Sequence, residues 1–313
     1  MLMKTAISAD NLCKNFNSTV AADKISFSVP RGEIFGFLGP NGAGKTTTLR
    51  MLTGLLRPDS GRAVIDGLDI SRHPIEAKMR MGVIPETSNV YADLSAFENL
   101  LLAGRFYGIE KNKLREKADN LLKRMGLYEK KDIEVRKFSK GMKQKVSVAC
   151  ALVNDASVLF LDEPAAGLDV KSRRLIREVI LEAKNSGAAI FLTSHDIQEA
   201  SVICERVAVI NRGKIAAIDT PENLKRIFEE TKSVEVSFDR LVDEKRLKDF
   251  AETEDVRKLG DKIKIYTPDP DRTVRALNSF SKKNNLTFTS LQILGSSLED
   301  AFIKLTVGDK DEN

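Results

Sequence analysis

The sequence has no apolar run long enough to cross a membrane. Nowhere does it approach the roughly 18 consecutive apolar residues that a membrane helix needs. Residues 1–5 also lack the apolar block of a signal peptide. We therefore expect a chain that does not span a membrane, so a role in transport would need a second chain to form the path.

Cysteine and histidine are scarce, with three and two copies among 313 residues. Cys13, Cys150 and Cys204 show neither metal-ligand nor redox-pair spacing. Cys150 and Cys204 fall in apolar stretches, so we expect reduced core residues of a cytoplasmic protein. His73 lies in a polar loop and is given no role, which leaves His195 as the histidine to be explained.

A strong excess of one charge is missing as well. Fifty basic and 45 acidic residues leave a net charge of +5, which is too mild to predict nucleic-acid binding. The balance would suit a protein beside an anionic membrane surface, but a lysine-rich solvated surface explains it better. We find no internal duplication, so each chain carries a single glycine-rich loop.

That loop lies between a predicted buried strand, Ile34–Leu38, and a predicted helix over residues 46 to about 55. Its glycines let backbone N–H groups point at phosphates, and the helix adds its positive end. Lys45 would neutralise phosphate charge and Thr46 would offer a hydroxyl to Mg²⁺. A chance glycine-rich turn is the weaker interpretation. The predicted phosphate-binding residues are Gly39, Pro40, Asn41, Gly42, Ala43, Gly44, Lys45, Thr46 and Thr47.

Two acidic residues and the histidine follow further apolar strands. Asp162 ends the run at residues 158–161, where a carboxylate can hold Mg²⁺, often through water. Strand side chains alternate, so Glu163 points elsewhere and could orient or deprotonate the attacking water. His195 follows the strand at residues 190–194 and could link the γ-phosphate to Glu163. Alone, these residues would be a strand-end acidic turn and a helix-capping histidine.

A second anion site is predicted before an apolar helix. Ser139 and Gly141, within Phe-Ser-Lys-Gly-Met at residues 138–142, would lie at that helix's N-terminus. Without the other motifs, an ordinary N-cap is the favoured interpretation.

The remaining pattern is α/β up to about residue 230. We expect short strands in the first stretch, including residues 24–29, and a hairpin turn at Asp66–Gly67. Ser95 and Glu98 form a capping box that opens a helical region, and residues 111–137 are predicted to be helical and lysine-rich. A helix over residues 170–185 and a hairpin over 207–218 follow.

Near residue 231 the pattern changes to alternating strands at residues 233–238, 262–266 and 286–289, with helices at 271–283 and 297–305 and a frayed end from 309. We predict a small α+β domain there. The predicted domains are therefore residues 1–230, with a helical part at about 90–155, and residues 231–313.

As an ordered set over about residues 5 to 225, these motifs resemble the ATP-binding cassette (ABC) ATPases. The phosphate-binding loop resembles Walker A, residues 158–163 Walker B, residues 138–142 the signature motif, residues 166–169 the D-loop, and His195 the switch histidine. Phe16 resembles the aromatic residue that stacks on adenine, with a core phenylalanine as the alternative. The resemblance implies an α/β P-loop cassette with an antiparallel β subdomain and a helical insert.

The resemblance also implies ATP hydrolysis with Mg²⁺, with Lys45, Glu163 and His195 as catalytic residues. Two copies, or this chain and a similar one, would each hold ATP between the Walker A loop of one and the signature motif of the other. The helical insert would dock on an integral membrane permease, placing the chain at the inner face of the cell membrane. No nucleic-acid partner is expected.

The sequence departs from the family pattern at two motifs. Lys140 and Met142 replace a glycine and a glutamine of the signature motif, and Glu86 stands where a glutamine that ligates the metal is usual. Both variants, and the α+β tail, resemble the branch that serves type-2 exporters for drugs or sodium.

Two other functions are weaker interpretations of the sequence. A non-transport cassette acting on DNA or ribosomes would carry long coiled coils or a second cassette, and neither is present in the sequence. A scaffold protein with an inactive cassette is disfavoured by Lys45, Asp162, Glu163 and His195.

Overall fold

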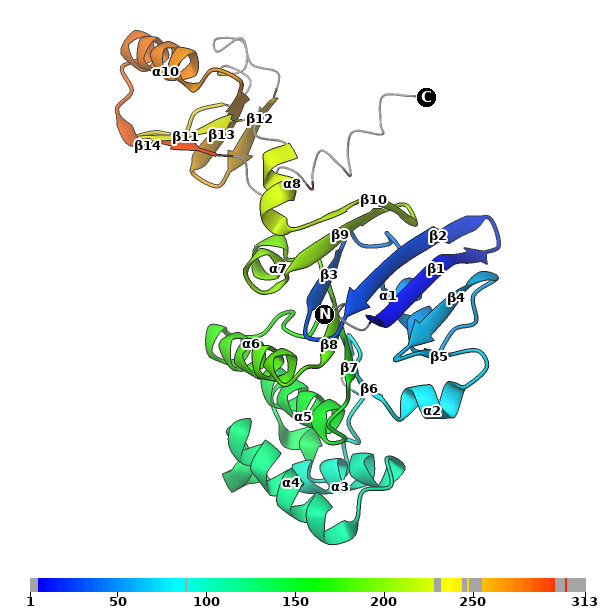
Figure 1. Ribbon diagram of the computed structural model, residues 1–313. Helices are drawn as coiled ribbons and strands as arrows, with labels where there is room; N and C mark the ends of the chain where they lie inside the picture. Colours follow the sequence, from blue (N-terminus) through cyan, green and yellow to red (C-terminus); the bar gives the residue numbers. More distant parts are fainter. Residues whose placement is uncertain are drawn as a thin grey trace. The chain divides into compact units, whose positions relative to one another are not determined.

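The computed structural model describes residues 5–87, 89–227, 232–243, 247, 255–295 and 302. Within these residues the chain forms two compact units, one ending at Thr220 and the other beginning at Pro221 (Figure 1). The change of sequence character near residue 231 therefore follows helix α8, Pro221–Ile227, which belongs with the second unit. In the described part, no helix has the length and apolar character that a membrane span requires.

A six-stranded sheet forms the centre of the first unit, in the order β10-β9-β3-β8-β7-β6. Neighbours from β9 to β6 are parallel, and β10 is antiparallel to β9. Strands β3, β7 and β8 are buried throughout, as their apolar runs predict. Residues that follow these strands therefore meet at one edge of the sheet. The strands are β3 Ile34–Leu38, β6 Met81–Ile84, β7 Val158–Asp162, β8 Ala189–Ser194, β9 Arg206–Asn211 and β10 Lys214–Asp219.

A second sheet of the first unit is antiparallel, in the order β2-β1-β4-β5. The prediction of short strands is wrong for its first two members, each 12 residues long. The predicted turn at Asp66–Gly67 is confirmed: it joins β4 to β5 with φ values of 51° and 85°. The strands are β1 Thr5–Phe16, β2 Thr19–Pro30, β4 Ser60–Ile65 and β5 Leu68–Asp69.

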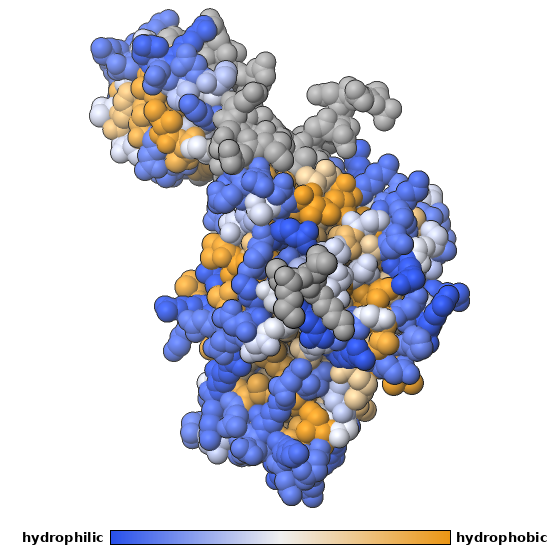
Figure 2. All heavy atoms as spheres, in the orientation of Figure 1, coloured by the Kyte–Doolittle hydropathy of each residue, from blue (hydrophilic) through white to orange (hydrophobic). Residues whose placement is uncertain are grey.

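A cluster of aromatic rings joins the two sheets. Phe27 of β2 stacks on Phe35 of β3 and Phe191 of β8, with ring centroids 5.0 Å and 5.5 Å apart. Phe37 and Phe160 complete the cluster from β3 and β7. Removing one such buried ring typically costs about 3–5 kcal/mol, so the cluster fixes one sheet against the other. The outer surface contrasts with this core: the face seen in Figure 2 is mainly hydrophilic, with scattered apolar patches.

The helices of the first unit follow much of the predicted pattern, but α1 ends at Leu52 rather than near residue 55, and α2 was not predicted. The capping box of Ser95 and Glu98 is confirmed at the start of α3. The predicted helix over residues 111–137 is wrong in its second half, because α4 ends at Arg124 and Gly126 takes φ 66°. Two 3₁₀ turns follow, held in part by the Val135 N–H donating to Leu94 O. The helices are α1 Lys45–Leu52, α2 Pro74–Lys78, α3 Ala96–Phe106, α4 Lys111–Arg124, α5 Lys140–Leu152, α6 Val170–Asn185 and α7 Ile197–Ile203.

The second unit contains a four-stranded antiparallel sheet in the order β12-β13-β11-β14. Helix α10, Pro270–Asn284, follows β13 and leads to β14 with β11 between them, which is a split βαβ arrangement. Strand β12 was not predicted, β14 begins later than expected, and the expected helix at 297–305 and frayed end lie outside the described residues, apart from Phe302. The strands are β11 Lys232–Phe238, β12 Asp255–Leu259, β13 Lys262–Thr267 and β14 Phe288–Leu294.

All three cysteines lie among the described residues and none forms a disulfide. Cys204 is buried, as predicted, whereas Cys13 and Cys150 are partly exposed. Burial nevertheless raises the pKa of the Cys150 thiol to about 12, so this residue stays a protonated structural thiol at neutral pH.

Candidate nucleotide-binding and catalytic site

The glycine-rich loop connects β3 to α1 at the carboxyl edge of the central sheet. Gly42 and Gly44 have φ values of 80° and 108°. A Cβ on Gly39 would lie 2.6 Å from Ile210 O, and one on Gly44 would lie 2.2 Å from Ala21 O. Close backbone approach thus requires glycine at both ends of the loop. Helix α1 begins without a side-chain cap, which suits an anion at its N-terminus.

Lys45 is buried inside this loop, with 6% of its surface exposed. Its Nζ donates to Gly39 O at 2.7 Å and to Pro40 O at 3.3 Å. The same ammonium lies 3.8 Å from Glu163 Oε1. The cation is therefore aimed at the loop interior and at the carboxylate after β7, where phosphate groups would meet both.

Asp162 is the last residue of β7 and is 3% exposed. Its Oδ1 accepts a hydrogen bond of 2.5 Å from the Thr193 hydroxyl. Thr193 lies opposite Asp162 in the parallel pairing of β7 with β8. Thr193 was not predicted as a site residue; the available signal was a pair of hydroxyl residues, Thr193 and Ser194, at the end of an apolar strand.

Glu163 follows Asp162 in the left-handed region, with φ 52°. Its N–H donates to Thr193 O and to Thr193 Oγ1, both at 3.2 Å. Glu163 Oε2 lies 2.6 Å from His195 Nδ1, as the sequence analysis predicted for this pair. The two neighbouring carboxylates thus separate through a backbone kink, in addition to the predicted strand alternation. This places one acid beside Lys45 and His195, and leaves the other beside Thr193.

Burial raises the pKa of the Glu163 carboxyl, while the charges of His195 and Lys45 act in the opposite direction. General-base catalysis is favoured when the pKa of the base lies near the operating pH, and the raised pKa of Glu163 is closer to it than the ordinary value. It also favours the protonated form in the folded state. Stability from this group is therefore present below the usual value of 4.5 and is lost as pH rises through the raised pKa.

With Glu163 as the predicted general base, we expect the rate of ATP hydrolysis to fall on acidification at a higher pH than an ordinary glutamate would give, because a carboxylate accepts a proton only when it is ionised. The pH dependence of kcat/KM, which reports the groups of the enzyme without nucleotide, would measure this. The Glu163→Gln variant should also lose the matching stability component in thermal unfolding between pH 4 and 8. An acidic limb at or below the usual value of 4.5 would contradict the assignment.

Three oxygen-bearing residues were predicted as metal ligands. Thr46 lies in the first turn of α1 and is partly exposed. Exposed Glu86 follows β6, which pairs in parallel with β7, so it lies beyond the same sheet edge as Asp162. Hydroxyl and carboxylate oxygens fit Mg²⁺. In the described ranges, no three His, Cys, Asp or Glu residues cluster as a metal site.

Ser139 is the exposed N-cap of α5, and its Oγ accepts from Met142 N at 3.3 Å. The capping hydrogen bond is therefore present, and the anion site at the same helix N-terminus stays a prediction. Gly141 faces the start of α6, since a Cβ there would lie 3.4 Å from Ser172 Oγ and 3.6 Å from Asp169 Oδ2. Among the described residues, no hydrogen bond or ion pair joins Ser139 or Gly141 to the glycine-rich loop.

Phe16 ends β1 with 47% of its surface exposed, so the alternative of a core phenylalanine is excluded. The Lys14 ammonium lies 5.7 Å from the centre of its ring. The β1–β2 hairpin also approaches the phosphate loop, where Ala21 O lies close to Gly44.

Two side chains missed by the sequence analysis connect parts of the site. Gln144 of α5 donates from Nε2 to Pro164 O at 3.1 Å, just after Glu163. Arg173 of α6 donates to Leu168 O at 3.4 Å and lies 3.8 Å from the Asp196 carboxylate beside His195. An arginine on an amphipathic helix is usually a solvated surface residue, so the sequence gives no signal that separates Arg173 from the other arginines of this helix.

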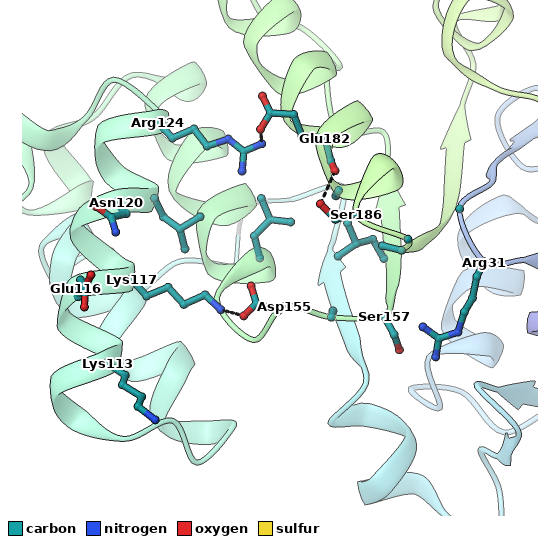
Figure 3. Close-up of a pocket in the computed structure, with 18 residues that line it drawn as sticks. Arg31, Lys113, Glu116, Lys117, Asn120, Arg124, Asp155, Ser157, Glu182 and Ser186 are labelled. Atoms are coloured by element: carbon teal, nitrogen blue, oxygen red, sulfur yellow. Dashed lines mark hydrogen bonds and ion pairs between the residues drawn. The ribbon is translucent and has the colours of Figure 1, made fainter.

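A cavity of about 900 Å³ lies at the opposite edge of the sheet (Figure 3). Ser157 and Ala188, which line it, immediately precede β7 and β8. Two ion pairs from α4 cross toward the segment after α5 and toward α6. This cavity therefore separates the helical part from the sheet and is not part of the nucleotide site. The ion pairs are Lys117–Asp155 and Arg124–Glu182.

Comparison with known proteins gives consistent matches. Residues 22–166 match the family model described as ABC transporter. The chain is 37% identical over 300 residues to the Nod factor export ATP-binding protein I of Ralstonia nicotianae, covering 96% of this chain and 93% of that protein. It is 31% identical to the linearmycin resistance ATP-binding protein LnrL of Bacillus subtilis, covering 96% and 98%.

A further curated relative is the daunorubicin/doxorubicin resistance ATP-binding protein DrrA of Streptomyces peucetius, 33% identical and covering 98% of this chain and 94% of that protein. Among solved structures, an ATP-binding subunit of an ABC transporter aligns with a TM-score of 0.68 and 31% identity, covering 72% of this chain and 93% of that one.

Proposed function

Because the chain belongs to the ABC transporter ATP-binding proteins, we propose that it is the ATP-hydrolysing subunit of an exporter whose membrane path is formed by a separate chain. It is an ATPase of this family. The exporter assignment is supported by relatives named for Nod factor export and for linearmycin and daunorubicin resistance. The proposed cassette spans residues 1–230, and residues 231–313 form an accessory α+β domain.

The observation that carries the proposal is the convergence of Lys45, Glu163 and His195 at one sheet edge. Lys45 and the glycine-rich loop would hold the β- and γ-phosphates. Glu163, held by His195, would accept the proton of the attacking water. Phe16 would stack on the adenine.

Mg²⁺ is proposed as the metal. Thr46 would bind it directly, Asp162 through its second oxygen or a water, and Glu86 from the end of β6. The ion, when bound, would neutralise phosphate charge as negative charge develops on the leaving oxygen. Thr193 fixes the Asp162 carboxylate for this role through its 2.5 Å hydrogen bond.

We further propose that two copies join head to tail around ATP. Ser139 and Gly141, the predicted second anion site, lie at the start of α5, and Gly141 faces α6. A second copy could place its Ser139 and Gly141 against the γ-phosphate. ATP would then favour the joined state, because it contacts both copies only there.

A groove in the helical part suits a membrane partner. It measures about 420 Å³ and is lined by residues of β6, α3 and α5. Phe106 and Tyr91 line it with 70% and 56% of their surfaces exposed. Exposed aromatic groups beside a groove are typical of a binding surface. We propose that the permease docks here, which would hold the chain at the inner face of the membrane.

Replacing Phe106 with aspartate should abolish co-purification of a polytopic membrane protein from detergent-solubilised membranes, since a charge would replace an exposed aromatic ring that lines the groove. Quantitative mass spectrometry after affinity purification would measure the loss, and ATP hydrolysis by the purified variant should stay near the native rate.

The matched control is Ile75→Asp, since Ile75 is 74% exposed on α2 and does not line the groove. Equal recovery with both variants would show that docking does not use this groove. Recovery of only ribosomal or DNA-repair proteins by the native chain would favour a non-transport ATPase instead.

A further inference from the structure

We propose that Asp59 is a positioning residue for the nucleobase: its carboxylate fixes the end of β1, so that Phe16 presents one ring face to a purine. The inference rests on the proposed role of Phe16 in ATP binding. No part of the nucleotide is expected to touch Asp59 itself.

Both carboxylate oxygens of Asp59 accept hydrogen bonds from the end of β1. Its Oδ1 accepts from Lys14 Nζ at 2.6 Å, and its Oδ2 accepts from Asn15 N at 2.8 Å. The Asp59 N–H donates to Cys13 O at 2.9 Å. Lys14 Nζ donates also to Arg57 O at 3.0 Å. The residues just before Phe16 are thus tied to the segment before β4 by four hydrogen bonds.

This arrangement requires a carboxylate in particular. Lys14 Nζ and Asn15 N are both donors, and each needs its own acceptor oxygen. An asparagine has one acceptor oxygen and one donor group, so its amide would face one of the two donors. The hydrogen bond from Lys14 also lowers the pKa of Asp59, which keeps the carboxylate ionised at neutral pH.

The Lys14 side chain connects the Asp59 carboxylate to the aromatic ring of Phe16. Lys14 and Phe16 are two residues apart on β1, and the position of the Lys14 ammonium over the Phe16 ring places both side chains on the same face. The Lys14 ammonium, anchored by Asp59, lies 5.7 Å from the ring centroid, and the Lys14 side chain is only 15% exposed. The cation covers one face of the ring, while 47% of Phe16 remains exposed. The uncovered face is the one offered to a base.

The hairpin is anchored to the phosphate loop at its other strand. The Asp23 N–H donates to Gly213 O at 2.8 Å, and the Gly213 N–H donates to Ala43 O at 2.9 Å. The hairpin is therefore held at two points: Asp59 binds the end of β1, and Gly213 binds β2. Phe16 is thereby set at a fixed distance from the phosphate loop, as a ligand with both a base and a triphosphate requires.

The test compares two ligands that differ in the base. Equilibrium binding of ATP and of inorganic triphosphate, each with Mg²⁺, would be measured on the full chain by calorimetry. Asp59→Asn should raise the Kd of ATP about fivefold, at the low end of what loss of one stacked base costs. The Kd of inorganic triphosphate should not change. Lys14→Met, which keeps the apolar stem, should act in the same direction.

Asp119→Asn is the matched control. Asp119 is the acid of another ion pair, 2.7 Å from Lys131, in the helical part. It should leave the Kd of both ligands unchanged. In a Phe16→Ala background, Asp59→Asn should have no further effect on ATP binding, because the two residues act on one contact.

The outcomes separate this inference from the proposed function. Equal weakening of both ligands by Asp59→Asn would show a merely structural role and overturn the inference. If Phe16→Ala weakens ATP binding and Asp59→Asn does not, the inference falls while the role of Phe16 stands. If Phe16→Ala leaves ATP binding unchanged, Phe16 does not stack on the base, and both ideas fail together.

Discussion

Replacing Glu163 with glutamine is expected to lower the ATP turnover number by about 10²- to 10⁴-fold, the usual contribution of a general base. The amide keeps the size of the side chain and can still contact His195, but it cannot accept a proton from water. ATP binding should persist, because Lys45 and the glycine-rich loop are unchanged. Steady-state phosphate release and the Kd of ATP would measure the two effects separately.

The same variant should accumulate as an ATP-bound pair of chains, since the nucleotide that joins the copies is no longer consumed. Size-exclusion chromatography with ATP, with ADP and without nucleotide would detect the pair. Glu178→Gln is the matched control, because Glu178 is half exposed and pairs with Arg174 on the surface of α6. A monomeric Glu163→Gln variant in ATP would remove the main support for the two-copy model, and native turnover would remove Glu163 as the base.

Replacing Lys45 with alanine should abolish ATP hydrolysis and weaken ATP binding. The lost charge-assisted hydrogen bond to phosphate is worth about 1.5–3 kcal/mol, so the Kd should rise by about 10- to 150-fold. The carbonyls of Gly39 and Pro40 also lose their buried donor, which loosens the loop.

A filter-binding or calorimetric measurement, together with a hydrolysis assay, would check this expectation. The matched control is Lys113→Ala, which removes an exposed lysine on α4. It should change neither the Kd of ATP nor the rate of hydrolysis. Circular dichroism should show that Lys45→Ala remains folded. Unchanged turnover would show that Lys45 does not act on the phosphates.

The central strands and the loop between them could be predicted because their signals are local. A strand buried on both faces is an unbroken apolar run, and the glycine spacing before Lys45 reflects backbone geometry within a few residues. The side chains that end β7 and β8 then had to meet, because parallel strands share an edge. The contact between Glu163 and His195 follows from that topology.

Other features depend on contacts between distant segments, which one sequence does not display. Thr193 acts on Asp162 only because β8 lies beside β7, and Asp59 acts on Lys14 only because β4 pairs with β1. The end of α4 was misjudged because lysine-rich residues favour helix, while the return of residues 127–137 toward α3 overrode that preference. The left-handed backbone conformation of Glu163 could not be predicted from the sequence, since glutamate rarely adopts this conformation.

The contacts of Lys45 have a consequence for how binding energy is used. Its ammonium braces two carbonyls of its own loop, and the close approaches at Gly39 and Gly44 lock the loop against neighbouring backbone. The phosphate cradle is therefore preorganised, and a triphosphate need not order a mobile segment as it enters. More of the free energy of nucleotide binding then remains available for mechanical work outside the cradle, such as drawing two chains together.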